Sequence, residues 1–229
     1  MGIHMPADGE LHPAQFVRGV GHAAARHGAR VFEGSTVRTL DAGSTGDVRV
    51  ETEHGEVRAA MVILATNARA GDLIPFFADK VDPVRGQMLA TAPCEPRFDC
   101  PIYANHGYDY WRQDEHGRVV LGGWRNLDPD GEVGHEEQVR DDIQEKMVEF
   151  LARMDVHAPV THRWAGIMGF SRDGLPMVGP VPGNAGALAG VGFTGHGFGF
   201  GFLAGQALAT QAIEGTHPVC VEFDPRRFA

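Results

Sequence analysis

The sequence predicts a mixed α/β protein in two parts, and three features carry this prediction. Residues 188–215 combine an apolar strand, a glycine-rich turn and a helix. Residues 36–66 alternate between apolar and polar side chains, as the strands of a β-meander do. Residues 81–123 contain short, aromatic-rich segments separated by turn residues, which is typical of an antiparallel sheet. A chain of 229 residues with 43% hydrophobic residues can form the core that such a fold needs.

The first expected helix begins at Pro13 and ends before Gly28. Proline suits the first turn of a helix, and glycine favours a helix end. Between them runs an apolar stripe with helical spacing, formed by Phe16, Val17, Val20 and Ala24. A strand at 29–32 is expected to follow this helix.

Three more strands are expected in the first part of the chain, at 36–40, 48–52 and 57–66, with a turn at 53–56. The last of them ends in the run MVILATNA, which is continuously apolar until it closes on small and polar residues. Such a run is typical of a buried central strand whose carboxyl end meets a ligand.

The middle of the chain is expected to form an antiparallel sheet, with strands at 81–92, 101–105, 108–112 and 119–123. His116 and Gly117 form an expected hairpin turn. Residues 135–154 are expected to form a surface helix, because apolar residues share one face and acidic residues crowd its first half. A strand after Pro159 and a polar turn at 171–174 then lead to the glycine-rich stretch.

The turn before the last helix contains five closely spaced glycines, namely Gly192, Gly195, Gly197, Gly199 and Gly201. The start of a helix leaves N–H groups without partners inside the helix and carries the positive end of the helix dipole. Glycines add no Cβ atoms that would block a close approach, so the turn suits an electron-rich group with partial negative charge. The alternative is that the glycines only permit tight packing of the helix against the strand.

Composition excludes several function classes. Twenty Lys and Arg against thirty Asp and Glu residues give a net charge of −10, so a nucleic-acid-binding surface is not expected. No metal site is expected either, because His and Cys residues lack the spacing of metal ligands. The three cysteines, together with the lack of a signal segment or membrane span, favour a reduced, cytoplasmic protein. An acyl-transfer hydrolase has little support, since no G-x-S-x-G sequence is present.

A series of short segments resembles one protein family over nearly the whole chain. In order, they are GELHP before a helix ending AARHGA, then STVRTL, VILATNA, PVRGQML, HGRVVLGG, RWAGIMGFSRDGLPMVG and GFTGHGFGFG. In content and order they resemble the FAD-dependent amine and amino-acid oxidoreductases related to D-amino-acid oxidase, glycine oxidase and sarcosine oxidase. Each segment alone is weak evidence, but the ordered series argues against chance.

The resemblance implies a partial FAD-binding, Rossmann-like domain made of residues 9–75 and 166–229, and an antiparallel-sheet substrate domain made of residues 76–165. It also implies FAD-binding residues, namely Val37 near the adenine half, Ala65, Thr66 and Asn67 beside the dinucleotide, Gly166, and Gly195, His196, Gly197, Phe198 and Gly199 at the pyrimidine edge of the flavin. Reduced flavin carries negative charge at that edge, which amides at a helix start would favour.

On the substrate side, Tyr110 matches a tyrosine that contacts the substrate carboxylate in glycine-oxidase-like relatives, although it could equally be a cross-strand packing residue. Arg112 and Arg125 are further candidates for substrate binding, unless they are surface charges. Relatives often carry a carboxylate-binding arginine after W-x-G, but this chain has Met168, whose alternative role is packing above the flavin. The expected substrate is therefore an amine, or an amino compound with a more distant acid group, unless Arg85, Arg112 or Arg125 substitutes.

The implied reaction is oxidation of a carbon–nitrogen bond of an amine or amino acid by hydride transfer to FAD, giving an imine that water hydrolyses. His196 and Tyr110 are the candidate catalytic residues. Protonated His196 would place positive charge near the flavin, whereas the alternative is a plain hydrogen bond within the turn. Some relatives use a lysine to promote the reaction with O2, and neither Lys80 nor Lys146 matches its position. The electron acceptor is therefore either O2 or another molecule.

One part of the family pattern is not found. The family opens with a strand and a G-x-G-x-x-G turn that binds the pyrophosphate, and residues 1–8 are too short to hold them. Two explanations stay open: the chain is a fragment of a longer enzyme, or a second polypeptide supplies the missing N-terminal half. Either way, weak FAD binding by this chain alone is expected. The rival interpretation is a non-catalytic or truncated module that contributes only part of an FAD site.

Overall fold

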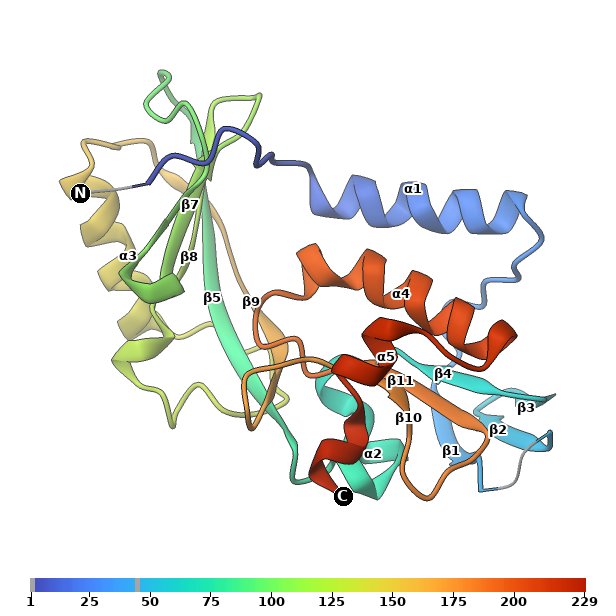
Figure 1. Cartoon of the computed structure of the whole chain (residues 1–229). Coiled ribbons are helices and arrows are strands. Elements are labelled where there is room, and N and C mark those ends of the chain that lie inside the picture. Colours follow the sequence, from blue (N-terminus) through green and yellow to red (C-terminus); the bar gives the residue numbers. More distant parts are fainter. Residues whose placement is uncertain (1–2, 44–45) are drawn as a thin grey trace.

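A computed structural model describes residues 3–43 and 46–229 of the chain (Figure 1). The α-helices are α1 (Pro13–Arg26), α2 (Ala70–Leu73), α3 (Asp141–Arg153), α4 (Gly197–Glu214) and α5 (Pro218–Glu222). The strands are β1 (Val37–Asp41), β2 (Val48–Thr52), β3 (Gly55–Ala59), β4 (Val62–Leu64), β5 (Val81–Pro93), β6 (Ile102–Ala104), β7 (Asp109–Gln113), β8 (Arg118–Gly123), β9 (Val160–Ser171), β10 (Met177–Pro180) and β11 (Ala187–Val191). Short 3-10 helices lie at Asn67–Arg69, Pro75–Phe77, Asn105–Gly107, Arg125–Leu127 and Pro225–Phe228.

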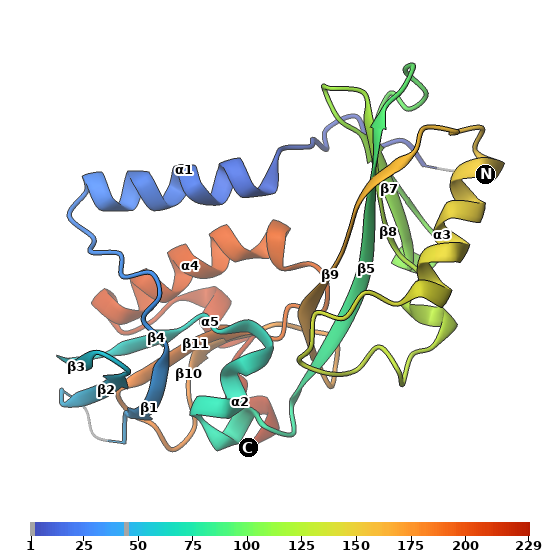
Figure 2. The same ribbon diagram turned by 180° about the vertical axis from the view of Figure 1, so that it is seen from behind.

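One layer of the molecule is an antiparallel sheet with the strand order β6-β7-β8-β5-β9. Its two long strands, β5 and β9, pair in a register that sets Gly86 opposite Gly166. α3 covers one face of this sheet, where Ile143 and Met147 are buried in one cluster with Leu121 (Figures 1 and 2). The opposite face is turned towards α1 and α4 (Figures 1 and 2).

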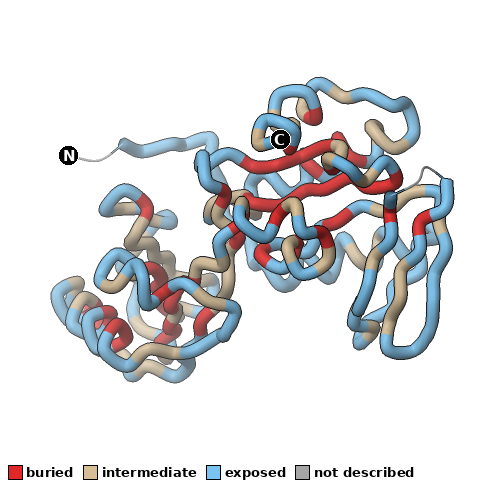
Figure 3. The backbone as a smooth tube through the Cα atoms, turned by 90° about the horizontal axis from the view of Figure 1, so that it is seen from below, coloured by how far each residue is buried: buried red, intermediate tan, exposed pale blue. Residues whose placement is uncertain are grey.

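A second sheet has the order β10-β11-β4, in which β11 pairs antiparallel with β10 and parallel with β4. One face packs against α4, where Leu188 is buried with Ala207 and Leu208. The other face forms a separate core that includes Met177 and Phe77. Buried residues gather in these two regions and under α3 (Figure 3). Among the described residues, no strand pairs with the outer edge of β4.

The predicted β-meander is confirmed as the antiparallel sheet β1-β2-β3. The single strand predicted at 57–66 is wrong, because it divides into β3 and β4. β3 pairs with β2 in the meander, whereas β4 pairs with β11 in the other sheet. The chain must therefore change sheets between them.

α1 is confirmed, with Pro13 at its start and the His12 side chain accepting a hydrogen bond from the Gln15 amide at 3.4 Å. It lies alongside α4 in both views (Figures 1 and 2). The Phe16 ring contacts the Phe198 ring of α4, with 5.6 Å between the centroids. The apolar stripe of α1 is nevertheless not buried, since Val17 is 61% exposed.

Two predicted elements differ in the structure: the strand at 29–32 and the start of the helix at 135. Residues 29–32 form no strand, because no neighbouring strand pairs with them, and Val31 and Phe32 stay exposed. The helix predicted from residue 135 begins only at Asp141, because the backbone just before it binds Gln87 of β5 instead. α5 was not expected from the sequence.

The predicted fold class, a mixed α/β chain with an antiparallel sheet, is confirmed. The domain boundaries stay a prediction; β9 runs through the predicted boundary at 165–166 within one sheet. In the part of the chain that the structure describes, no helix has both the length and the apolar character needed to span a bilayer.

Candidate functional site

The turn between β11 and α4 holds several residues in left-handed backbone conformations. Gly192 and Gly195 have φ values of +70° and +81°, and Thr194 has +52°. The Thr194 amide donates to the Gly169 carbonyl at 2.9 Å, which docks the turn on β9. His196 occupies the N-cap position of α4 without a side-chain cap, so the first amides of the helix remain free to bind another group.

A cavity of about 500 Å³ lies at this end of α4. It brings together six residues that the sequence predicts for cofactor or substrate binding, namely Ala65, Asn67, Met168, Gly195, Gly197 and Phe198. Gly201 and Gly205 line it on α4, and a Cβ atom on either would meet no atom within 4 Å. The space beside this glycine face of α4 is therefore open, and it fits a flat ring system close to the helix backbone.

Asn67 connects β4 to β9 at the wall of this cavity. Its side-chain amide donates to the Ile167 carbonyl at 2.9 Å, and its side-chain oxygen accepts from the Gly169 amide at 2.8 Å. Asn67 itself has a φ of +51°. Asn67, three residues after the end of β4, thus holds the backbone of β9 in place.

A second cavity of about 1130 Å³ lies between residues 3–10 and the open face of the five-stranded sheet. Tyr110, Arg112 and Met88 line it. Gly195 lines both cavities, so they meet at the turn before α4.

Tyr110 lies flat on the sheet because Gly122 leaves room for its ring. A Cβ atom on Gly122 would collide with the Met88 sulfur and with the Tyr110 ring. The Tyr110 hydroxyl lies 3.4 Å and the Met168 methyl group 3.2 Å from the position that a Cβ on Gly86 would take. Burial raises the pKa of Tyr110, and the nearby Arg125 charge opposes this only in part. Tyr110 is therefore a protonated hydrogen-bond donor at neutral pH.

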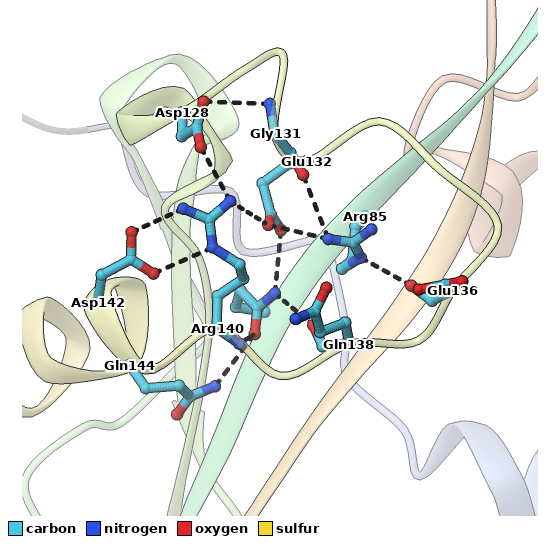
Figure 4. Close-up of polar contacts among 10 residues, drawn as sticks. Arg85, Asp128, Gly131, Glu132, Glu136, Gln138, Arg140, Asp142 and Gln144 are labelled. Carbon is cyan, nitrogen blue, oxygen red and sulfur yellow. Dashed lines mark hydrogen bonds and ion pairs between the residues drawn. The ribbon is translucent and has the colours of Figure 1, made fainter.

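A buried polar network lies beneath this surface, on the α3 side of β5 (Figure 4). Glu132 is fully buried and accepts hydrogen bonds from Arg85 at 3.3 Å and from Gln87 at 3.0 Å. The Gln87 oxygen accepts from the Arg140 amide at 3.1 Å. Because Arg85 and Gln87 point into the network, Gly86 between them points to the opposite, site-facing surface.

Two arginines that could replace the missing carboxylate-binding residue are already engaged. Arg85 is paired with the buried Glu132. Arg112 donates to the Glu10 carboxylate at 3.3 Å and to the Leu11 carbonyl at 2.9 Å, so it holds the segment before α1. Arg85 is buried and bonded through both Nε and Nη1, whereas Arg112 makes these bonds through Nη1 alone and lines the larger cavity.

Arg125 has a different environment. Its guanidinium carbon lies 4.3 Å from the centroid of the Tyr108 ring and 5.0 Å from that of the Phe170 ring. Neither aromatic partner could be found from the sequence, because Tyr108 lies in the turn before β7 and Phe170 on β9, and only the fold brings them to Arg125.

His196 is exposed, and its Nδ1 atom lies 2.9 Å from the Thr194 carbonyl oxygen. A carbonyl only accepts, so Nδ1 carries the proton of this hydrogen bond and Nε2 points elsewhere. The His196 ring also approaches the Tyr103 ring, with 6.5 Å between the centroids. His196 therefore makes the hydrogen bond within the turn through Nδ1 and still has its second ring nitrogen, Nε2, available.

Five predicted cofactor residues do not line the cavity at α4, namely Val37, Thr66, Gly166, His196 and Gly199. Val37 lies in the meander on β1, and Gly166 lies on β9 opposite Gly86. Their assignment stays a prediction. The chain also contains a G-x-G-x-x-G spacing at Gly190, Gly192 and Gly195, which runs from β11 into the turn before α4.

Residues 3–43 and 46–229 contain no group of three or more His, Cys, Asp or Glu side chains placed to hold a metal ion. Asp173 is the turn acceptor that its sequence context indicates, since its carboxylate accepts from the Leu175 amide at 3.1 Å. Arg227 binds the same carboxylate at 2.6 Å.

Comparison with known proteins connects this geometry to a family. A probable oxidoreductase, OrdL, from Rhizobium meliloti is 26% identical over 218 residues, which cover 93% of this chain and 49% of that protein. Glycine oxidase from Pseudomonas aeruginosa is 30% identical over 188 residues, covering 80% of this chain and 48% of that enzyme. The chain spans about half the length of these curated relatives.

Solved structures show the same fold. The crystal structure of L-proline dehydrogenase from P. horikoshii superposes with a TM-score of 0.78 at 21% identity, over 97% of this chain and 61% of that one. Glycine oxidase from Geobacillus kaustophilus gives a TM-score of 0.74 at 21% identity, over 93% of this chain and 56% of that one. The sequence pattern of the FAD dependent oxidoreductase family matches residues 1–211. The chain therefore belongs to the FAD dependent oxidoreductase family, as its sequence resemblance predicts.

Proposed function

We propose that the protein to which this chain belongs oxidises a carbon–nitrogen bond of an amine or amino acid. FAD, when bound, would supply the acceptor for a hydride from the α-carbon of the substrate, and the resulting imine would be hydrolysed by water. The observation that carries the proposal is the cavity at the start of α4, where Ala65, Asn67, Met168, Gly195, Gly197 and Phe198 meet. Relatives named glycine oxidase and gamma-glutamylputrescine oxidoreductase support the substrate class.

The chain's contribution at the flavin is electrostatic. The free amides at the start of α4 would hold the electron-rich pyrimidine edge of FAD and would stabilise negative charge there. Gly195 and Gly197 would let the backbone approach closely, and the proposed role of His196 is to place its second ring nitrogen, Nε2, near the same edge. The amides need no reorganisation during the reaction, because the Thr194 amide fixes the turn to β9.

The chain's contribution at the substrate is orientation beside a partly apolar surface. Tyr110 donates a hydrogen bond from a buried hydroxyl, while Met168 and the bare backbone of Gly86 form an apolar surface next to it. Such surroundings disfavour a charged ammonium, so the substrate binds with its amine uncharged. The uncharged amine is the form that can lose hydride.

The open edge of β4 supports the proposal that a further segment completes the FAD site. This segment is either the N-terminal half of the same protein or a second polypeptide, and it adds a strand beside β4. The electron acceptor is O2 or another molecule. Lys80 and Lys146 are paired with Asp79 and Glu149, respectively, which supports the view that neither promotes the O2 reaction. Three free cysteines in the described residues support a reducing, cytoplasmic compartment.

A FAD titration tests this proposal, with flavin fluorescence and absorbance as readouts. The chain alone and a longer protein that includes the upstream in-frame sequence are compared. We expect weak binding by the chain and tight binding by the longer protein. In the longer protein, Gly205→Leu should abolish tight binding by filling the cavity, whereas Gly21→Leu, on the open surface of α1, should not. Tight stoichiometric FAD binding by the chain alone refutes the proposal that the chain holds only part of the FAD site. Absence of FAD binding by both proteins refutes the proposed function.

The second candidate function is a non-catalytic or truncated subunit that contributes only part of an FAD site. It is favoured by the coverage of about half of each relative and by the open β4 edge. Hydrogen peroxide formation and dye reduction across a panel of amines distinguish the candidates. Activity of the longer protein supports the enzyme, and FAD binding without any substrate oxidation supports the non-catalytic subunit.

A further inference from the structure

Thr194, in the turn before α4, has a strained backbone. Its φ of +52° lies in the left-handed region, which a β-branched residue rarely adopts. Such a conformation persists only where the surrounding structure holds it in place. Thr194 comes two residues before His196, the N-cap of α4. The direction of the first amides of α4 therefore depends on the contacts that hold Thr194.

Ser171, the last residue of β9, makes two of these contacts. Its amide donates to the Thr194 hydroxyl oxygen at 3.2 Å, and the two hydroxyl oxygens lie 3.2 Å apart. The Ser171 hydroxyl lies closer to the Leu175 carbonyl oxygen, at 2.7 Å, than to the Asp173 carboxylate, at 3.2 Å. Carbonyl and carboxylate oxygens only accept, so Ser171 donates to Leu175, and Thr194 is the donor between the two hydroxyls. Ser171 is buried, which limits the access of water to these bonds.

Arg227, near the C-terminal end of the described chain, fixes the two acceptors that surround the Ser171 hydroxyl. Its Nε and Nη2 atoms donate to the two oxygens of the Asp173 carboxylate at 2.6 and 3.0 Å, and Nη2 also donates to the Leu175 carbonyl at 2.8 Å. Nη1 donates to two backbone carbonyls just before Arg227, at 3.1 and 3.3 Å. Every N–H group of the guanidinium thus has an acceptor within the protein. Arg227 therefore holds the backbone together and has no donor left for a ligand.

The segment that carries Arg227 is anchored to the sheet β10-β11-β4. The Val178 amide of β10 donates to the Phe223 carbonyl at 2.9 Å, and Phe228 packs against the core on one face of this sheet. The turn before α4 follows β11 of the same sheet, whereas residues 171–175 follow β9 of the five-stranded sheet. Arg227 thus connects the two sheets beside the turn.

We infer that Arg227 is a positioning residue for the turn before α4. It orients Ser171 through the Leu175 carbonyl and the Asp173 carboxylate, and Ser171 in turn holds Thr194 in its left-handed conformation. What the turn binds rests on the proposed function, in which the free amides of α4 face the flavin. Loss of the Arg227 contacts should therefore loosen the turn and leave the five-stranded sheet folded.

Amide hydrogen exchange of the chain, followed by NMR without FAD, tests this inference. The Thr194 amide donates to the Gly169 carbonyl, so its exchange reports on opening of the turn. The Leu121 amide reports on opening of the five-stranded sheet, because β8 lies between β5 and β7. Circular dichroism melting curves establish that each variant is folded.

The variants separate the guanidinium of Arg227 from the charge of its segment. Arg227→Gln removes the charge, and Arg227→Lys keeps the charge with a single donor nitrogen. Arg226→Gln is the matched control, because the neighbouring Arg226 instead binds Asp224 at the start of the same 3-10 helix. Ser171→Ala removes the side chain through which Arg227 acts on Thr194.

We expect Arg227→Gln to accelerate exchange of the Thr194 amide at least about tenfold more than that of the Leu121 amide, because hydrogen bonds to a charged group are lost. Arg227→Lys should have an intermediate effect, and Arg226→Gln none. In a protein that already carries Ser171→Ala, Arg227→Gln should cause no further acceleration at Thr194. Equal acceleration at Thr194 and Leu121, unchanged exchange at Thr194, or a full further effect in the Ser171→Ala protein overturns the inference.

A FAD titration of the longer protein tests whether this positioning serves the cofactor. Arg227→Gln should weaken FAD binding severalfold, because binding must then order the turn, and Arg226→Gln should not. Unchanged FAD binding by a variant whose Thr194 amide has lost protection overturns the role of Arg227 towards the cofactor. If the longer protein binds no FAD at all, the proposed function fails, whereas the exchange results, obtained without FAD, still decide whether Arg227 positions the turn.

Discussion

Replacing Glu132 with glutamine removes the one fully buried carboxylate of the network under the substrate sheet while keeping the shape of the side chain. Arg85, whose side chain is 5% exposed, then loses its counter-charge but keeps the Gly131 and Glu136 carbonyls as acceptors. Breaking a buried ion pair from one side costs roughly 3–5 kcal/mol. Because Arg85 keeps these carbonyl acceptors, we expect the free energy of unfolding to fall by the lower value of this range, about 3 kcal/mol.

Urea unfolding followed by tryptophan fluorescence measures this loss, since Trp124 and Trp111 belong to the core under α3. With a urea dependence of about 2–3 kcal/mol per molar, the midpoint should fall by about 1 M or more. Asp142→Asn is the control, because Asp142 joins the same network through Arg140 but is 63% exposed, so its loss should stay below about 1 kcal/mol. If Glu132→Gln and Asp142→Asn unfold at the same urea concentration, the buried ion pair between Glu132 and Arg85 contributes no more to stability than the exposed one.

Two further predictions concern the site surface and the acid range. Gly122→Ala should destabilise the protein by roughly 1–3 kcal/mol in the same urea assay, because its Cβ would collide with Met88 and Tyr110; an unchanged midpoint would contradict this packing. Chiefly through its hydrogen bond with Arg227, Asp173 has a pKa of about 2, below its unfolded value of about 3.9. This carboxylate therefore stabilises the fold above pH 4, and its contribution is lost as the pH falls from about 4 through 2. Melting temperatures between pH 2 and 6 should decline less steeply for Asp173→Asn, and parallel curves would refute the assignment.

The elements that could be predicted from the sequence are those whose signals are local. Pro13 and Gly28 bracket α1, whose bounds are Pro13–Arg26. The glycines before Phe202 predict a strand, a turn and a helix, and α4 indeed begins at Gly197 after β11. Six residues of the predicted cofactor and substrate sets meet in one cavity. Five of them follow β4 or β11 in the chain, and these two strands are parallel neighbours, so their carboxyl ends lie side by side. The sixth, Met168, lies on the adjoining β9.

The elements that escaped prediction depend on partners far away in the chain. Val31 and Phe32 have strand-forming side chains, but no strand lies beside them. The start of α3 is delayed because Gln87, more than fifty residues earlier, binds the backbone that precedes it. The ring partners of Arg125 could not be found either, since only the folded chain brings Tyr108 and Phe170 close to its guanidinium.

The position of the turn before α4 relative to the five-stranded sheet depends on a few contacts around Gly169. The Gly169 carbonyl accepts from the Thr194 amide at 2.9 Å, and its amide donates to Asn67 at 2.8 Å. A Cβ on Gly169 would lie only 2.9 Å from the same Asn67 oxygen, so no larger residue fits without displacing it. Asn67 also holds the Ile167 carbonyl, and β9 itself continues into the substrate sheet. Because the turn, the end of β4 and β9 are fixed to one another at this glycine, the two predicted domains are expected to behave as one rigid unit here, with closure over a substrate left to other segments.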